Sequence, residues 1–209
     1  MGFTETLIYF LYLIISSQGI NKIMILYHGS HKRFEQFDLD CALTGNKKVK
    51  FGYGIYLSSS FRSAAHYSYR EDMEHRYVYE VEIPELNDDN SLEFKTKVSQ
   101  SIIERAKERL NRDIPIKAMA DGKCFRLFIA SLYEDDGAIE AERNASLFLD
   151  SIGVIGIRWP YCWKNPALGF NVAVFNAEYI RIRNLFEVQL DSKRQLIDGS
   201  ENILKSFVV

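Results

Sequence analysis

Short apolar runs that end in small or polar residues predict strands in the first part of the chain. Residues 23–27 form such a run and lead into His28, Gly29 and Ser30, as is typical of a strand entering a turn. Residues 54–58 (GIYLS) form a second run, bounded by glycine and serine. Alanine and aromatic residues at helical spacing predict a helix over residues 60–70.

Apolar and polar residues alternate over residues 77–83 (YVYEVEI), which predicts a third, half-buried strand that Pro84 ends. Glu80 and Glu82 are two positions apart and therefore share one face of this strand. Because both are charged, we expect that face to be exposed to solvent.

The middle of the chain has helical periodicity. Residues 99–110 are amphipathic, with an apolar stripe on one side, and residues 124–133 are mostly apolar, as in a buried helix. Residues 140–152 form a further helix, which Gly153 ends in the position of a C′ glycine. The apolar stripes need burial, so we expect this helical part to support the fold.

Three more strands are predicted in the last third of the chain. One starts at Gly156, and the other two cover residues 171–175 and 179–182. Residues 190–209 are weakly patterned and are expected to form a peripheral helix or a frayed tail. Strands and helices do not alternate regularly, which predicts an α+β fold.

Composition limits the class of protein. The 209 residues, 47% of them hydrophobic, provide for one sizeable core in a single domain. The net charge of -2 does not indicate a nucleic-acid or anionic membrane surface, and the lysines at 47, 48 and 50 are interpreted as a solvated loop. Cys41, Cys124 and Cys162 are interpreted as reduced thiols, with a catalytic cysteine as the alternative, and no zinc pattern is present.

The N-terminus allows three interpretations. The apolar run at residues 7–15 is too short to span a bilayer. It has the length of a signal-peptide core, but no basic residue precedes it. Translation could instead begin at Met24, directly before the first strand. We expect a cytoplasmic protein without a membrane anchor, and a secreted protein is the alternative.

Three separated segments place a polar or aromatic residue beside a glycine or small residue. They read YHGS at residues 27–30, FGYGIYLS at 51–58 followed by AAHY at 64–67, and FNVAVF at 170–175. In this order they resemble the ADP-ribosyltransferase superfamily, specifically its His-Tyr-Glu branch of diphtheria-toxin-like toxins and poly(ADP-ribose) polymerases. The closest likeness is to the ADP-ribosyltransferase-like domains of phage and mobile-element polyvalent proteins, which share a segment that reads ASLFLDSIGVIGI here, at residues 145–157.

The resemblance covers roughly residues 25–183. It implies an ADP-ribosyltransferase-type split β-sandwich at residues 24–186, with a helical insertion at about 95–152. Residues 1–23 are then an N-terminal extension and residues 187–209 a C-terminal tail.

The resemblance also implies a binding site for NAD⁺, which is the substrate. The family's histidine, which hydrogen-bonds a ribose hydroxyl, corresponds to His28. Its two tyrosines correspond to Tyr56 and Tyr67, whose rings could hold the flat nicotinamide cation. A glycine backbone can approach the carboxamide closely, as we expect of Gly29. The implied NAD⁺-binding set is His28, Gly29, Ser30, Gly54, Tyr56 and Tyr67. A serine that contacts the carboxamide in many members falls at Ala64, and Ser60 or Ser63 could compensate.

The third segment departs from the family, whose glutamate falls at Asn171. The implied catalytic set is therefore His28, Tyr56 and Asn171. An amide can hydrogen-bond the ribose but supplies no negative charge, which could cost on the order of a hundredfold in rate. Glu142, or Glu80 or Glu82, could reach the site in its place.

We therefore expect an NAD-dependent mono-ADP-ribosyltransferase, such as an effector, toxin or phage-borne modifier, that acts on a protein or other macromolecular acceptor. The alternatives are an NAD glycohydrolase and a catalytically weak module that binds NAD⁺ or ADP-ribose. Polymer formation, a metal and a membrane are not expected, and a nucleic-acid acceptor stays open. His31, His66 and His75 are interpreted as surface residues.

Overall fold

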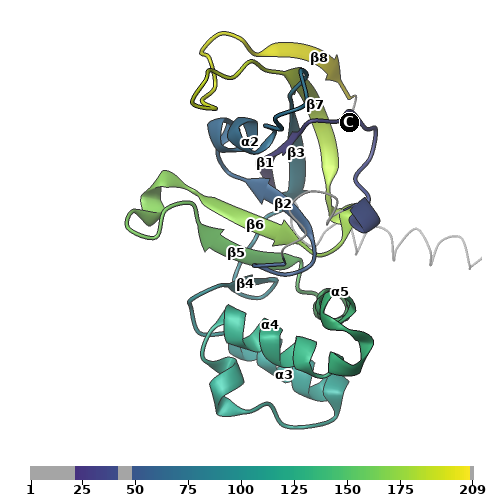
Figure 1. Ribbon diagram of the computed structural model, residues 1–209. Helices are drawn as coiled ribbons and strands as arrows, with labels where there is room; N and C mark the ends of the chain where they lie inside the picture. The colour runs from purple at the N-terminus through teal and green to yellow at the C-terminus, as the bar shows by residue number, and fades with distance from the viewer. Residues whose placement is uncertain (1–21, 42–48, 208–209) are drawn as a thin grey trace, which may run out of the picture.

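The computed structural model describes residues 22–41 and 49–207 (Figure 1). Within these residues the protein contains one open, mixed sheet of eight strands, together with four α-helices. The predicted α+β class is confirmed. The strands are β1 (Ile23–Ser30), β2 (Ile55–Ser58), β3 (Tyr77–Pro84), β4 (Ser91–Glu93), β5 (Gly156–Pro160), β6 (Phe170–Val174), β7 (Arg181–Glu187) and β8 (Asn202–Ser206). The helices are α2 (Phe61–Tyr67), α3 (Gln100–Leu110), α4 (Gly122–Ser131) and α5 (Ala138–Ser151).

The sheet has a seam between β1 and β2, in the middle of the order β4-β5-β6-β2-β1-β3-β7-β8. β1 pairs with β3 through eight residue pairs, and β2 pairs with β6 through four. Across the seam, one residue pair joins the two strands, Tyr27 with Ser58. In Figure 1, β3 and β7 run steeply while β5 and β6 cross the view, so the two halves of the sheet diverge at this seam.

One half of the sheet is packed against helices. α3, α4 and α5 lie below β4, β5 and β6 in Figure 1, and their apolar side chains form one core with these strands. Ser99 accepts a hydrogen bond from the Ile102 amide at the start of α3, and Asp121 accepts one from the Cys124 amide at the start of α4. The fully buried members of this core include Ile102, Phe125, Ile129, Leu149, Ile157 and Phe175. The three predicted helices are confirmed, and α4 and α5 each begin two residues earlier than expected.

The other half is covered by the short helix α2, which contacts β1 at close range. Ser60 is the N-cap of α2, and the Ala64 and Ala65 side chains are buried. A Cβ atom at Gly29 would lie 1.8 Å from the Ala64 carbonyl oxygen. Only glycine fits here, because any side chain would push α2 away from the strand.

Two expectations for β3 are wrong. The strand is buried on both faces, because Tyr79, Val81 and Ile83 lie in one apolar cluster while Val78 packs with Ala64 and Ala65 of α2 on the other side. Glu82 is only 7% exposed and forms an ion pair with Arg183 of β7. Glu80 is half-buried and accepts a hydrogen bond from the Asn184 amide at 2.7 Å. Arg183 and Asn184 of β7 therefore stabilise the two carboxylates that the sequence pattern predicted to be exposed to solvent.

The C-terminal region also differs from expectation. Asn202–Ser206 form the edge strand β8, which pairs with β7, so these residues are neither a helix nor a frayed tail. β7 begins at Arg181, and residues 177–179 form a 3₁₀ turn before it. The apolar run at residues 7–15 and two of the three clustered lysines, at 47 and 48, lie outside the described residues. In the described part of the chain, no helix combines the length and apolar character needed to cross a membrane.

Candidate functional site

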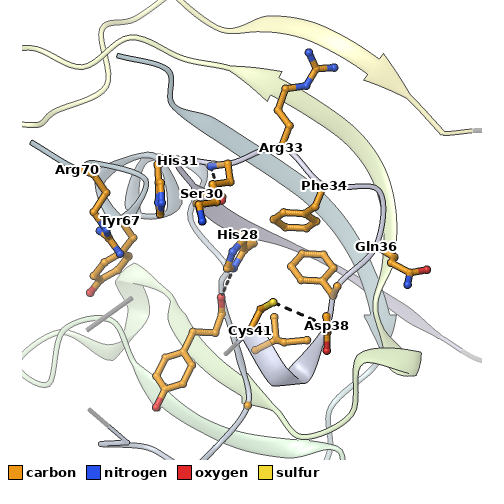
Figure 2. A pocket seen from close by; sticks show the side chains of 16 residues that line it. His28, Ser30, His31, Arg33, Phe34, Gln36, Asp38, Cys41, Tyr67 and Arg70 are labelled. Atoms are coloured by element: carbon orange, nitrogen blue, oxygen red, sulfur yellow. Dashed lines mark hydrogen bonds between the residues drawn. The ribbon is translucent and has the colours of Figure 1, made fainter. Parts of the chain in front are cut away.

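A cleft of about 380 Å³ lies at the seam of the sheet (Figure 2). It is lined by the end of β1, by the turn that follows it, by the start of β2 and by the end of α2. Six residues of the set predicted from sequence line this one cleft, although they come from separate segments. They are His28, Gly29, Ser30, Gly54, Tyr56 and Tyr67.

His28 lies at the centre of the cleft and is held in one orientation. Its Nδ1 atom is 2.9 Å from the backbone oxygen of Tyr56. A carbonyl oxygen can only accept, so Nδ1 carries the proton and Nε2 is left as an acceptor. Burial lowers the pKa of His28 below its usual 6.5, and the hydrogen bond to Tyr56 offsets part of this shift. The imidazole is therefore neutral near pH 7, with Nε2 able to accept from a hydroxyl.

Aromatic side chains pack beside His28. The Phe37 ring meets the imidazole edge-to-face, with 5.1 Å between centroids. Phe34 stacks on Tyr79 at 4.1 Å, and its amide donates to the Tyr79 hydroxyl at 2.7 Å. Burial raises the pKa of Tyr79 to about 12. These contacts fix the turn after β1, and no sequence motif had indicated that Phe34 or Phe37 belongs to the site.

Tyr56 is anchored through its hydroxyl. The hydroxyl donates to the Gly52 carbonyl at 3.0 Å and accepts from the Phe51 amide at 3.2 Å. The ring meets Trp159 edge-to-face at 5.5 Å, and burial raises the pKa of the phenol. Tyr56 therefore lines the cleft and holds His28 through its backbone oxygen, while its ring packs against the helical core and its hydroxyl holds the preceding turn.

Tyr67 lies across the cleft at the C-terminal end of α2. Figure 2 shows Tyr67 and Arg70 to one side of His28, with Phe34 to the other. The Tyr67 side chain is 59% exposed. A ring that is this open can close over a flat ligand without losing packing in the core.

The rim of the cleft is cationic, which the sequence pattern did not predict. Lys32, Arg33 and Arg70 all line it, from the turn after β1 and the loop after α2. His31, which was interpreted from the sequence as a surface residue, lines the cleft as well and is half-buried. Burial lowers the pKa of His31, and the charges of Arg70 and Lys32 lower it further. This positive field favours an anionic group of a ligand.

Asn171 is not among the residues that line the cleft. It pairs with Ser58 of β2 and Trp159 of β5 and is 6% exposed. In the same register Ala173 pairs with Tyr56, so Asn171 lies on the sheet face that bears the Tyr56 ring. Asn171 is therefore two residues along β6 from the partner of Tyr56 and lies outside the cleft lining.

None of the three glutamates considered as replacements lines the cleft. Glu142 forms a buried ion pair with Arg126 of α4, and Glu80 and Glu82 bond to β7. Among the described lining residues, the carboxylate is Asp38. Its oxygens are oriented by the Asp40 amide at 2.9 Å and by the Cys41 thiol at 3.9 Å.

The two serines considered beside Ala64 have other positions. Ser60 caps α2 by accepting from the Ser63 amide at 3.3 Å. The Ser63 hydroxyl is buried and has no hydrogen-bond partner among the described residues. Neither serine lines the cleft. His66 and His75 are exposed, as expected.

Within residues 22–41 and 49–207, no group of three or more His, Cys, Asp or Glu side chains is arranged to hold a metal ion. No protein-family model, curated protein or solved structure matches the chain. The interpretation of the cleft therefore depends on its geometry and chemistry.

Proposed function

We propose that the chain is an NAD⁺-dependent mono-ADP-ribosyltransferase with an ADP-ribosyltransferase-type split β-fold. It would transfer ADP-ribose to a macromolecular acceptor and release nicotinamide. The proposal depends above all on one observation: the residues of the first two motifs, which are far apart in the chain, line one cleft around His28.

The chemistry of the cleft fits the parts of NAD⁺. Its volume of about 380 Å³ lies within the range of small-molecule sites. The free Nε2 of His28 can accept a hydrogen bond from a ribose hydroxyl. Tyr56 and Tyr67 offer aromatic rings to the nicotinamide cation, and Lys32 and Arg70 offer positive charge to the diphosphate.

In the proposed reaction, the bond between ribose C1′ and the nicotinamide nitrogen breaks. Its electron pair stays on nicotinamide, which leaves as a neutral ring. The acceptor nucleophile forms a new bond to C1′ and loses its proton to solvent. Holding the ribose on His28 and the ring beside Tyr56 would align these atoms and reduce the entropic cost of the step.

The second candidate is NAD⁺ hydrolysis, or NAD⁺ binding with little turnover. It is favoured by Asn171, which supplies no charge to the ribosyl cation that develops as nicotinamide leaves. Glu142 and Glu82 are held in ion pairs and do not compensate. The open rim of the cleft would admit water as the acceptor.

One experiment separates these functions. The purified protein is incubated with NAD⁺ labelled in the adenylate moiety, with and without cell lysate. Labelled macromolecules indicate transfer, and free labelled ADP-ribose alone indicates hydrolysis. Intact labelled NAD⁺ that co-elutes with the protein indicates a binding module. His28→Ala should abolish each of these signals, and His75→Ala, an exposed histidine outside the cleft, should leave them unchanged. Equal signals from the His28 variant and the wild type would overturn the assigned site.

A further inference from the structure

A row of aromatic rings leads from the cleft to the surface of the other half-sheet. Beyond the contact of Tyr56 with Trp159, the Trp159 ring stacks on Phe51 with 3.8 Å between centroids and 3° between planes. Phe51 meets Phe94 at 4.8 Å, and Phe94 meets Trp163 at 5.9 Å. Trp163 lies between β5 and β6 and is 44% exposed, so the row ends in a large ring open to solvent.

Each of the three outer rings has a lysine ammonium group over it. The pairs, with the distance from nitrogen to ring centroid, are Lys50 with Phe51 (5.2 Å), Lys123 with Phe94 (6.0 Å) and Lys95 with Trp163 (4.2 Å). The three lysines are exposed and come from separate parts of the chain. Folding therefore gathers a positive patch that the net charge of -2 does not reveal.

The three lysines of this patch are not held in ion pairs within the described residues. None of the three lysines forms an ion pair with a carboxylate of the described residues. Glu93, the residue nearest in sequence to Lys95 with a negative charge, is paired with Arg158. Asp121, next to Lys123 along the chain, is the N-cap of α4. The ammonium groups are therefore available to an anion that approaches from solvent.

We propose that Phe51, Trp163, Lys50, Lys95 and Lys123, which we name the aromatic-lysine surface, bind single-stranded nucleic acid. Ammonium groups bind the phosphates of a strand, and the exposed Trp163 ring stacks with an unpaired base, while Phe51 is half-buried. A duplex hides the faces of its bases, and an acidic peptide has no flat groups for the rings, so a single strand fits both features of the surface. Because the row begins at Tyr56, a bound strand would lie beside the cleft as its acceptor; this last part rests on the proposed function.

The test measures binding without NAD⁺. A fluorescein-labelled single strand of about 12 nucleotides, as oligo-dT and as oligo-U, is titrated with protein at several salt concentrations and followed by anisotropy. Binding should weaken steeply with salt, and the combined Lys50→Ala, Lys95→Ala and Lys123→Ala variant should bind at least tenfold more weakly and with a smaller salt slope. The chain has two tryptophans, Trp159 and Trp163, and both lie in the row, so stacking should also quench tryptophan fluorescence.

Two matched variants give the control. Trp163→Ala should weaken binding about tenfold, and Trp163→Phe should retain most of the affinity because a ring remains for stacking. Lys205→Ala removes a lysine that also lies over a ring, that of Phe207 at 4.4 Å, but on β8. It should leave binding unchanged.

Four outcomes would overturn the proposal. They are absence of binding at low salt, equal affinity of the combined lysine variant, equal affinity for a duplex of the same charge, and preference for a polyglutamate peptide. Since NAD⁺ is absent, failure of this test leaves the transferase proposal standing. Conversely, if the protein binds single-stranded nucleic acid but never consumes NAD⁺, only the proposed transferase activity is refuted.

Discussion

The two halves of the sheet differ in what packs against their strands. The half made of β4, β5, β6 and β2 is packed against α3, α4 and α5 and encloses a large apolar core. Strand pairing joins the half made of β1, β3, β7 and β8 to it through one residue pair, and the cleft opens there. A second apolar cluster, with residues of β1, β3 and β7 and of β2 and β6, packs the two halves together. Where strand pairing ends, backbone and side chains become available to a ligand. Functional groups therefore collect at the seam, while the largest apolar cluster lies beneath the helices.

The largest effect expected from this contrast is on stability in the helical half. Phe125 of α4 is fully buried. Phe125→Ala should lower the free energy of unfolding by about 3–5 kcal/mol, because it leaves a cavity in the core. Urea denaturation followed by circular dichroism measures this loss. The matched variant at the seam, Phe37→Ala, removes a half-buried ring and should cost less; a larger loss there would contradict the division of roles.

The second prediction restores the missing charge. Asn171→Glu should raise NAD⁺ consumption at least tenfold and up to the order of a hundredfold, because a carboxylate would stabilise the ribosyl cation. Nicotinamide release measures the rate. Asn171→Gln adds the same length without charge and should not raise it. If the glutamate variant is no faster, the charge comes from another residue, and loss of activity in Asp38→Asn would identify that residue as Asp38.

The cationic rim should act on binding rather than on the chemical step. Arg70→Ala should raise KM for NAD⁺ about tenfold with little change in kcat, because it removes a charged hydrogen bond to the diphosphate. Initial rates over a range of NAD⁺ concentrations separate the two constants. Arg62→Ala is the control, since Arg62 of α2 is exposed and pairs with Asp198 outside the cleft. A fall in kcat alone for Arg70→Ala would refute this role.

The smallest expected effect is a pH dependence of stability. The pKa of His28 is lowered in the folded protein by burial, so the unfolded chain binds the proton more readily. The stability that this neutral imidazole contributes is complete above pH 6.5 and is lost as pH falls below it, toward the folded pKa. The wild type should therefore lose more unfolding free energy between neutral and acidic pH than His28→Gln does. Parallel curves for the two proteins would show that His28 is not buried in this way.

Local patterns in the sequence were sufficient for the helices and for the first two motifs. The apolar stripe of residues 99–110 predicted α3, because that pattern is complete within a short segment. That His28 and Tyr56 would share one cleft was expected from the family resemblance, since neither segment alone indicates it. The edge strand β8 was not predicted, because a strand with both faces exposed has no alternation to detect.

Other features depend on partners that are remote in sequence. Glu82 looked solvent-exposed until folding placed Arg183 beside it. Lys32 and Arg70 looked like ordinary surface charges, and only the end of α2 brings Arg70 to the same rim as Lys32. The position of Asn171 outside the cleft lining follows from strand register, which local periodicity does not fix.

The most direct test of the central claim is a crystal structure with a non-hydrolysable NAD⁺ analogue. The account predicts the nicotinamide ring between Tyr56 and Tyr67, a ribose hydroxyl on Nε2 of His28, and the diphosphate beside Arg70. An analogue bound away from the seam, or a crystal grown with saturating analogue that shows none in this cleft, would contradict it.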